Sequence, residues 1–217
     1  MFVCTYPYIL SLTLMVRNRF FTQSWNASRH LPRKDSNALL AEFHDKFDLL
    51  ARSLRPQFTP NLTKVRQELP ALFSRAPFIL THGDLCEMNL LINPTAGHIT
   101  GIVDWAEARV LPFGFSLWAL ENILGYMDSK GWHYYDNRRE LEHLFWQTFI
   151  EGAGSPSDFD LPLIQTARMA GLFYRYGFSV DGKEFKGVVD QADASSLAYP
   201  DAFCSVDDLA PTKTTCE

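Results

Sequence analysis

The sequence predicts an α+β fold that is mostly α, with one small β-hairpin among several helices. Five segments repeat apolar residues at three- and four-residue steps, a spacing that lines one face of a helix. Two short apolar runs flank a turn that contains proline and glycine, a pattern typical of a hairpin. The chain has 217 residues, 47% of them apolar, which is enough for one substantial core, so a single domain is the first expectation.

The predicted helices account for most of the chain. In the first of them Leu39, Phe43, Phe47 and Leu50 share one face, and Pro56 follows its end. The five helical segments cover residues 35–54, 61–73, 115–127, 138–152 and 161–177. After about residue 187 the chain mixes Asp, Ala, Ser and Pro without a period, so a loosely ordered tail is expected.

The predicted strands lie between the second and third helices. Residues 77–82 form a short apolar run, which indicates a buried strand. Residues 90–92 and 99–103 lie on either side of the turn-like sequence 93–97 and form the predicted hairpin. Residues 2–16 are apolar as well, but they lack a positive leading region and are shorter than the ~20 residues of a membrane helix. Buried strand or hinge material is therefore favoured there over a targeting segment.

Charge and cysteine usage exclude several classes of protein. The formal net charge is −5 and no basic block is present, so neither nucleic acid nor a membrane surface is expected as a partner. The four cysteines are far apart and form no C-x-x-C pair, which favours a reducing, cytoplasmic location over a disulfide framework or a zinc site.

The polar residues that suggest chemistry surround the hairpin. Asp84 and Asn89 lie five residues apart on one loop, and Asp104 stands where the second hairpin strand ends. Carboxylate and amide oxygens suit Mg²⁺, which takes its remaining ligands from water and phosphate. A carboxylate that holds no metal can orient a hydroxyl and accept its proton. Phosphoryl transfer needs this combination, because positioning and charge neutralisation supply most of its catalysis.

Each residue also has a simpler explanation when it is taken singly. Asp84 could cap a turn and Asn89 could hold a loop, whereas the trio together favours a phosphotransfer site. For His82 a structural contact with backbone carbonyls is favoured over a chemical role. A zinc hydrolase built from His82 and Asp84 with His98, His133 or His143 is disfavoured, because the histidines lack metal-binding spacings.

Other side chains near the hairpin have less specific interpretations. Glu107 could touch substrate or metal, or lie on the surface. Glu121 could meet a cationic substrate, although a solvated helix face is favoured. Phe115, Trp105 and Trp118 are most simply core residues.

The string His82-Gly83-Asp84-Leu85 with Asn89-Leu90-Leu91, followed by Gly101-Ile102-Val103-Asp104-Trp105, resembles the aminoglycoside phosphotransferase and choline kinase-like family. The resemblance implies a protein-kinase-like fold and Mg²⁺-dependent transfer of phosphate from ATP, as co-substrate, to a small-molecule hydroxyl. It implies that Asp84 is the catalytic aspartate, that His82 braces its loop, and that Asn89 and Asp104 bind Mg²⁺. The best-matched region is about 78–118. A departure follows it, since Ser116 stands where the family often has a second aspartate.

The sequence before Asp84 lacks the phosphate-binding elements of a kinase-type enzyme. A Gly-rich loop and a strand lysine normally hold the nucleotide phosphates, but the first glycine of this chain is Gly83. The resemblance therefore implies a C-terminal lobe at 31–186, preceded by a hinge remnant or alternative N-terminus at 1–30 and followed by the tail at 187–217. Activity in such a truncated form is expected to be impaired. The alternative is a catalytically silent binding module whose exposed apolar lobe surface meets a protein partner.

Overall fold

The computed structural model describes residues 19–93, 99–154, 161–181, 184–190 and 197–204, and the apolar segment 2–16 lies outside them. Within these ranges the chain is mostly helical with small antiparallel sheets, as the sequence predicts. Residues 19–26 are also helical. The labelled helices are α2 (Arg33–Ser53), α3 (Thr59–Arg75), α4 (Glu121–Leu124), α5 (Arg138–Ala153), α6 (Leu161–Tyr176) and α7 (Ala198–Cys204). Three short 3₁₀ segments accompany them in this part of the chain: η1 (Pro56–Phe58), η2 (Glu87–Asn89) and η3 (Leu117–Leu120).

The strands pair as separate two-stranded antiparallel ladders in the described part of the chain. The ladders join β1 (Phe78–Thr81) with β4 (Arg109–Pro112), β2 (Leu90–Ile92) with β3 (Ile99–Ile102), β5 (Gly125–Asp128) with β6 (Gly131–Tyr134), and β7 (Phe178–Asp181) with β8 (Glu184–Val188). The predicted hairpin is thus confirmed as β2–β3. None of the helices in the described ranges has the length and apolar character needed to cross a membrane.

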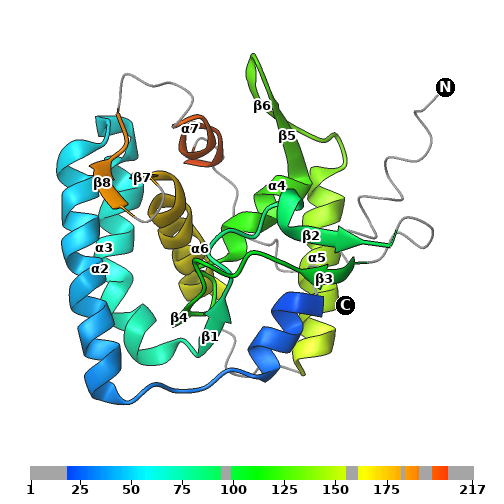
Figure 1. Ribbon diagram of the computed structural model, residues 1–217, viewed down its shortest axis with the longest axis horizontal. Helices are drawn as coiled ribbons and strands as arrows, with labels where there is room; N and C mark the ends of the chain where they lie inside the picture. Colours follow the sequence, from blue (N-terminus) through cyan, green and yellow to red (C-terminus); the bar gives the residue numbers. More distant parts are fainter. Residues whose placement is uncertain (1–18, 94–98, 155–160, 182–183, 191–196, 205–217) are drawn as a thin grey trace, which may run out of the picture.

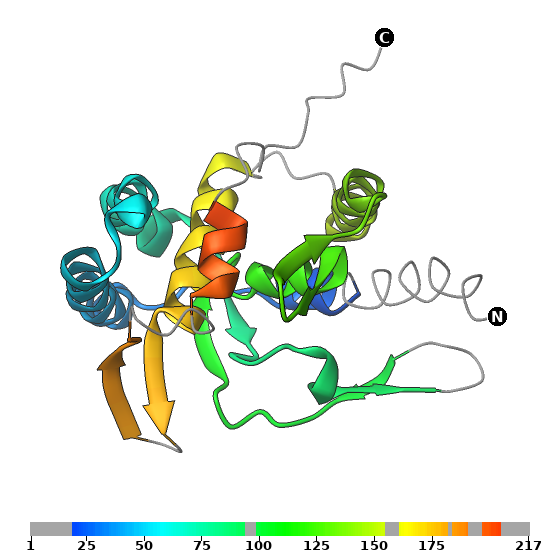
Figure 2. The ribbon, with the colours of Figure 1, turned by 90° about the horizontal axis from the view of Figure 1, so that it is seen from above.

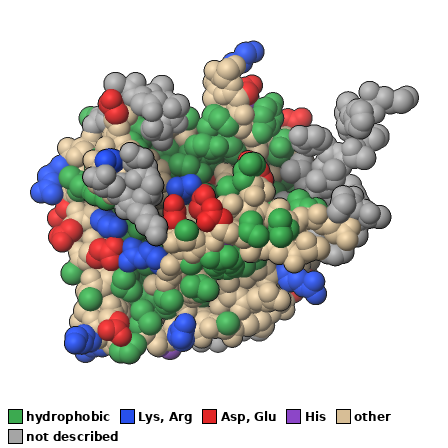
Figure 3. All heavy atoms as spheres, in the orientation of Figure 1, with side chains coloured by type: hydrophobic (Ala, Val, Ile, Leu, Met, Phe, Trp, Pro, Cys, Tyr) green, Lys and Arg blue, Asp and Glu red, His purple; other side chains and the backbone are tan. Residues whose placement is uncertain are grey.

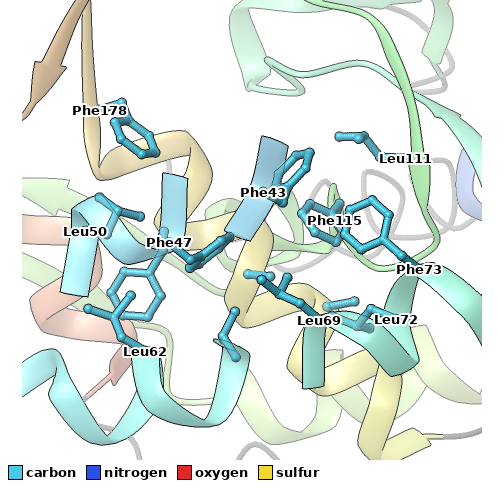
Figure 4. Packing of buried hydrophobic residues seen from close by; sticks show 14 of the residues in the cluster. Phe43, Phe47, Leu50, Leu62, Leu69, Leu72, Phe73, Leu111, Phe115 and Phe178 are labelled. Carbon is cyan, nitrogen blue, oxygen red and sulfur yellow. The ribbon is translucent and has the colours of Figure 1, made fainter. Parts of the chain in front are cut away.

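Helix α6 runs through the middle of the molecule and packs on both sides (Figure 1). On one side α2 and α3 lie against it, and Phe43, Phe73 and Phe115 point toward one another there (Figure 4). The ring centroid of Phe43 lies 5.3 Å from that of Phe73 and 5.1 Å from that of Phe115. Phe43 and Phe73 lie on α2 and α3, and Phe115 joins them from the turn before η3. On the other side a second core gathers η3, α4, α5 and the helix at residues 19–26.

The segment before α2 is part of this second core. Phe21 is fully buried, and its ring lies 5.8 Å from that of Phe145 on α5. Trp25 packs edge-on against Phe113 at 4.8 Å. Arg29 then forms an isolated antiparallel bridge with Phe78 of β1. Residues 19–29 are therefore integrated with the body of the fold.

Two predicted regions differ from the structure. Residues 115–127 form η3, the one-turn helix α4 and then β5, instead of one continuous helix. Helix α4 ends at Gly125, whose extended backbone lies so close to β6 that a Cβ there would be 2.4 Å from the backbone oxygen of His133. In the predicted tail, residues 198–204 form α7, whose Phe203 is buried.

Strands β1 and β4 lie at the two ends of residues 82–108, the segment that contains the candidate site residues. They pair in register from Phe78 opposite Pro112 to Thr81 opposite Arg109. The Thr81 hydroxyl also donates a hydrogen bond to the Arg109 backbone oxygen at 2.8 Å. Between these ends the chain leaves the helical body, forms the β2–β3 hairpin and returns, so the hairpin extends along one side of the molecule (Figure 2).

A double ion pair fastens β4 to α2. The two Arg109 Nη atoms donate to the two carboxylate oxygens of Glu42 at 2.9 and 2.7 Å. Arg109 also donates to the Tyr174 hydroxyl at 2.9 Å, and Lys46 lies 3.0 Å from the Glu42 carboxylate. The Arg109 hydrogen bonds hold the pKa of Glu42 below its ordinary value of 4.5.

This pKa shift predicts an acid-sensitive contribution to stability. The folded protein holds the Glu42 proton less tightly than the unfolded chain, so unfolding takes up a proton below about pH 4.5 and stability falls there. Glu42→Gln removes this group, and we expect the urea midpoint of the variant to fall less steeply between about pH 5 and pH 3. Parallel midpoint-against-pH curves for the two proteins would contradict the assignment.

Candidate active site at the β2–β3 hairpin

His82 follows the last residue of β1 and is fully buried. Its Nε2 lies 2.8 Å from the Val103 backbone oxygen, and the Asp84 backbone N–H donates to its Nδ1 at 3.3 Å. These two partners assign the proton to Nε2 and leave Nδ1 as an acceptor, the arrangement of a neutral imidazole. The ring therefore connects the two loops on either side of the hairpin, the one that carries Asp84 and the one that carries Asp104.

Gly83 is required by the close approach of these loops. Its φ is +83°, a left-handed conformation that glycine adopts without steric cost. A Cβ at this position would lie 2.5 Å from the backbone oxygen of Glu107 and 2.7 Å from its Cβ. The backbone at residue 83 therefore rests directly on the loop that follows Asp104.

Asn89 closes the loop that begins at Asp84. The Asn89 Nδ2 donates to the Asp84 backbone oxygen at 2.8 Å and to the Asp84 Oδ2 at 3.3 Å. The side chain is 8% exposed, at the end of the 3₁₀ turn η2. Both contacts are made by the amide nitrogen, so the amide oxygen takes no part in the contact with Asp84.

Asp104 is held through its neighbour Val103. The Val103 N–H donates to the Asn89 backbone oxygen at 3.0 Å, and the Val103 carbonyl oxygen accepts from His82. Asp104 comes next and is exposed. Its φ is +60°, and among the described residues no other non-glycine residue has a positive φ. Such a conformation costs energy and is enriched at functional sites.

The donor set fits a hard divalent cation. Asp104 supplies an exposed carboxylate, Asn89 supplies an amide oxygen, and Asp84 lies on the same loop as Asn89. Mg²⁺ is bound in this sparse way, because it keeps waters and takes phosphate oxygens as ligands. Within the described ranges no three His, Cys, Asp or Glu side chains gather as a group that could hold a metal by themselves.

The structure shows one residue of the site that the sequence does not indicate. Arg175, in the last turn of α6, places Nη2 2.5 Å from the Asp84 Oδ1. It is 91 positions away from Asp84, so no local pattern could have found it. On the face of the molecule that Figure 3 shows, acidic side chains lie beside a cationic one near the middle, with hydrophobic side chains around them.

Trp105 is not a core residue, contrary to the prediction. Its side chain is 38% exposed, its Nε1 donates to the Ile102 backbone oxygen at 2.9 Å, and its ring covers that of His82 at 4.7 Å. The tight turn at Asp104 brings the indole over the histidine on the outer side. Phe115 and Trp118 are confirmed as core residues, each 3% exposed.

Glu121 is shielded from solvent and lies in a buried ion pair. It is 2% exposed and forms an ion pair with Arg168 of α6, while the Tyr134 hydroxyl donates to its Oε2 at 3.2 Å. Arg168 also pairs with Glu142 at 2.8 Å. Burial opposes the charge on Arg168, but the two carboxylates outweigh it and raise its pKa. The solvated helix face that the sequence favours for Glu121 is therefore wrong, and contact with a cationic substrate stays a prediction.

The remaining candidates lie apart from this arrangement. Glu107 is exposed, and its backbone packs on Gly83. His133 pairs with Asp128 at 2.8 Å in the β5–β6 hairpin, and His143 is exposed on α5. His98 lies outside the described residues.

Comparison with known families agrees with the resemblance. The model of the phosphotransferase enzyme family (APH) matches residues 17–132. This range covers more than half of the 217 residues, and the chain belongs to that family. The matched range contains Asp84, Asn89 and Asp104, and ends before α5, α6 and α7. A comparison with curated proteins finds no match.

Proposed function

We propose that this chain carries a Mg²⁺-dependent phosphotransfer site, at which ATP phosphorylates the hydroxyl of a small molecule. The observation that supports it most is the clamp on Val103, whose N–H and carbonyl bond to Asn89 and His82. This clamp ties the loop of Asp84 and Asn89 to the position of Asp104. We further propose that the helical body corresponds to the C-terminal lobe of a protein-kinase-like fold.

Each residue has a separate role in this proposal. Asp84 orients the acceptor hydroxyl and takes its proton as the hydroxyl oxygen bonds to the γ-phosphorus and the bond to the ADP oxygen breaks. Asn89 and Asp104 would hold Mg²⁺, which would supply neutralisation of the charge on the phosphates. His82 acts through geometry, because its buried ring joins the two loops.

We expect the 217-residue chain by itself to be a slow enzyme. It has no glycine before Gly83, so its residues supply no Gly-rich loop for the nucleotide phosphates. Loss of one oriented electrostatic partner typically costs about 10²–10³ in rate. Transfer of labelled phosphate to a panel of hydroxyl compounds should therefore be weak in this form.

Nucleotide binding gives the direct test. We expect Mg²⁺·ATP to bind the chain with heat detectable by titration calorimetry, and Asp104→Ala to weaken that binding at least tenfold, because it removes a ligand carboxylate. Glu107→Gln removes the neighbouring acid of the same loop and serves as the matched control, with an expected change below about threefold. Equal losses in the two variants would show a general charge effect and contradict the role of Asp104.

A second candidate is a binding module without catalysis. Four large apolar side chains are exposed on β1, the 82–89 loop and the hairpin: Leu80, Met88, Leu91 and Ile92. An exposed apolar group of this kind suits a protein partner. If wild-type chain binds no Mg²⁺·ATP in the calorimeter even at millimolar nucleotide, the module replaces the phosphotransferase as the better proposal.

A further inference from the structure

The two carboxylates of the candidate site differ in their surroundings. Asp84 forms an ion pair with Arg175, and its other oxygen accepts a hydrogen bond from Asn89. Asp104 is exposed and has no ion pair within the described part of the chain. A divalent cation would therefore find an unneutralised charge at Asp104 and a neutralised one at Asp84.

Arg175 is held in its place by two aromatic rings. Its guanidinium carbon lies 5.7 Å from the ring centroid of Trp118 and 5.9 Å from that of Tyr176. The two rings pack edge-to-face at 5.6 Å, and Trp118 is buried in the core beneath. These cation–π contacts orient the guanidinium toward the loop of Asp84.

The pairing restricts what the Asp84 carboxylate can do. Oδ1 accepts from Arg175 at 2.5 Å and Oδ2 from Asn89 at 3.3 Å, so both oxygens have a donor that fixes the plane of the carboxylate. Arginine cannot serve as a metal ligand and repels a cation. A carboxylate in this state can still accept a proton from a hydroxyl, but it competes poorly for a metal.

We propose that Arg175 is a positioning residue that keeps Asp84 out of the metal's coordination, so that the cation is bound by Asp104 and Asn89 and Asp84 stays with the acceptor. The inference rests on the proposed function. The residue that would separate the roles of Asp84 and Asp104 therefore lies on α6, outside the range that matches the family model.

Binding of Mn²⁺ alone, followed by electron paramagnetic resonance, tests this without nucleotide or turnover. We expect Arg175→Gln to bind Mn²⁺ about tenfold more tightly than the wild type, because the Asp84 carboxylate loses its cationic partner and becomes available to the metal. Arg175→Lys keeps the charge and should stay within about twofold of the wild type. Arg66→Gln removes a distant cation, paired with Asp48 on α2, and should change nothing.

The route through Asp84 is tested by a double variant. In the Asp84→Asn background, Arg175→Gln should give less than about a twofold gain, because no carboxylate is left to release. A full tenfold gain in that background would overturn the inference, as would unchanged or weaker Mn²⁺ binding in Arg175→Gln with native near-ultraviolet circular dichroism. Arg175→Lys binding as tightly as Arg175→Gln would also overturn it.

Failure of the proposed function has a different signature. If the wild type binds Mn²⁺ and loses it in Asp104→Ala while Arg175→Gln has no effect, the metal site stands and the role of Arg175 falls. If neither the wild type nor any variant binds Mn²⁺, the metal site falls and the role of Arg175 falls with it.

Discussion

Replacing Arg168 with methionine is expected to lower the free energy of unfolding by about 3–5 kcal/mol. In the variant the Glu121 carboxylate, 2% exposed, loses its cation and keeps one neutral donor, the Tyr134 hydroxyl. It also removes the contact of Arg168 with Glu142. Urea denaturation at neutral pH measures the loss.

Two controls separate a buried charge from lost packing. Arg66→Met breaks an exposed pair with Asp48 and should cost less than about 1 kcal/mol. Adding Glu121→Gln to Arg168→Met removes the uncompensated charge and should recover part of the stability. A loss below about 1 kcal/mol in Arg168→Met would mean that Glu121 is neutral or hydrated in the folded protein.

The second large effect is expected for Gly83→Ala, which should reduce Mg²⁺·ATP binding by about tenfold or more and destabilise the protein by about 1–3 kcal/mol. The added methyl group would lie 2.5 Å from the Glu107 backbone oxygen. The two loops must then separate, which moves Asp84 away from the segment of Asp104. Calorimetry of nucleotide binding and thermal unfolding measure the two consequences.

Gly154→Ala distinguishes a steric clash from backbone strain. Gly154 has φ +72°, close to the +83° of Gly83, but a Cβ there would meet nothing within 4 Å. It should therefore show the strain cost alone and leave nucleotide binding unchanged. Similar binding losses in the two variants would show that the contact with Glu107 does not position the site.

Regular elements with a local signal were predictable from the sequence. Helices α2, α3, α5 and α6 each carry an apolar stripe that faces the core, and β2 and β3 flank a segment whose sequence contains proline and glycine. The spacing of Asp84, Asn89 and Asp104 is likewise local, because two loops and one hairpin contain all three. Sequence was sufficient for these elements, because their signal lies within a short stretch of the chain.

Features that depend on distant contacts were not predictable. Strand β4 consists of four residues without alternation, and pairing with β1 makes it a strand. The end of α4 at Gly125 depends on the approach of His133 and Trp132. Two side-chain contacts were not predictable for the same reason. Arg168 of α6 pairs with Glu121 in the core, and Arg175 reaches Asp84 from the C-terminal end of α6.

The β1–β4 ladder has a consequence for local opening. It ties Thr81 to Arg109, so the stretch that holds His82, Asp84 and Asp104 is closed at its base by one short antiparallel pairing. Inside it the Val103 amide and the His82 ring link the two halves to each other. Segments joined in this way exchange their amide protons as one cooperative unit. The residues that would bind the metal and the residue that would receive the proton therefore gain and lose their geometry together.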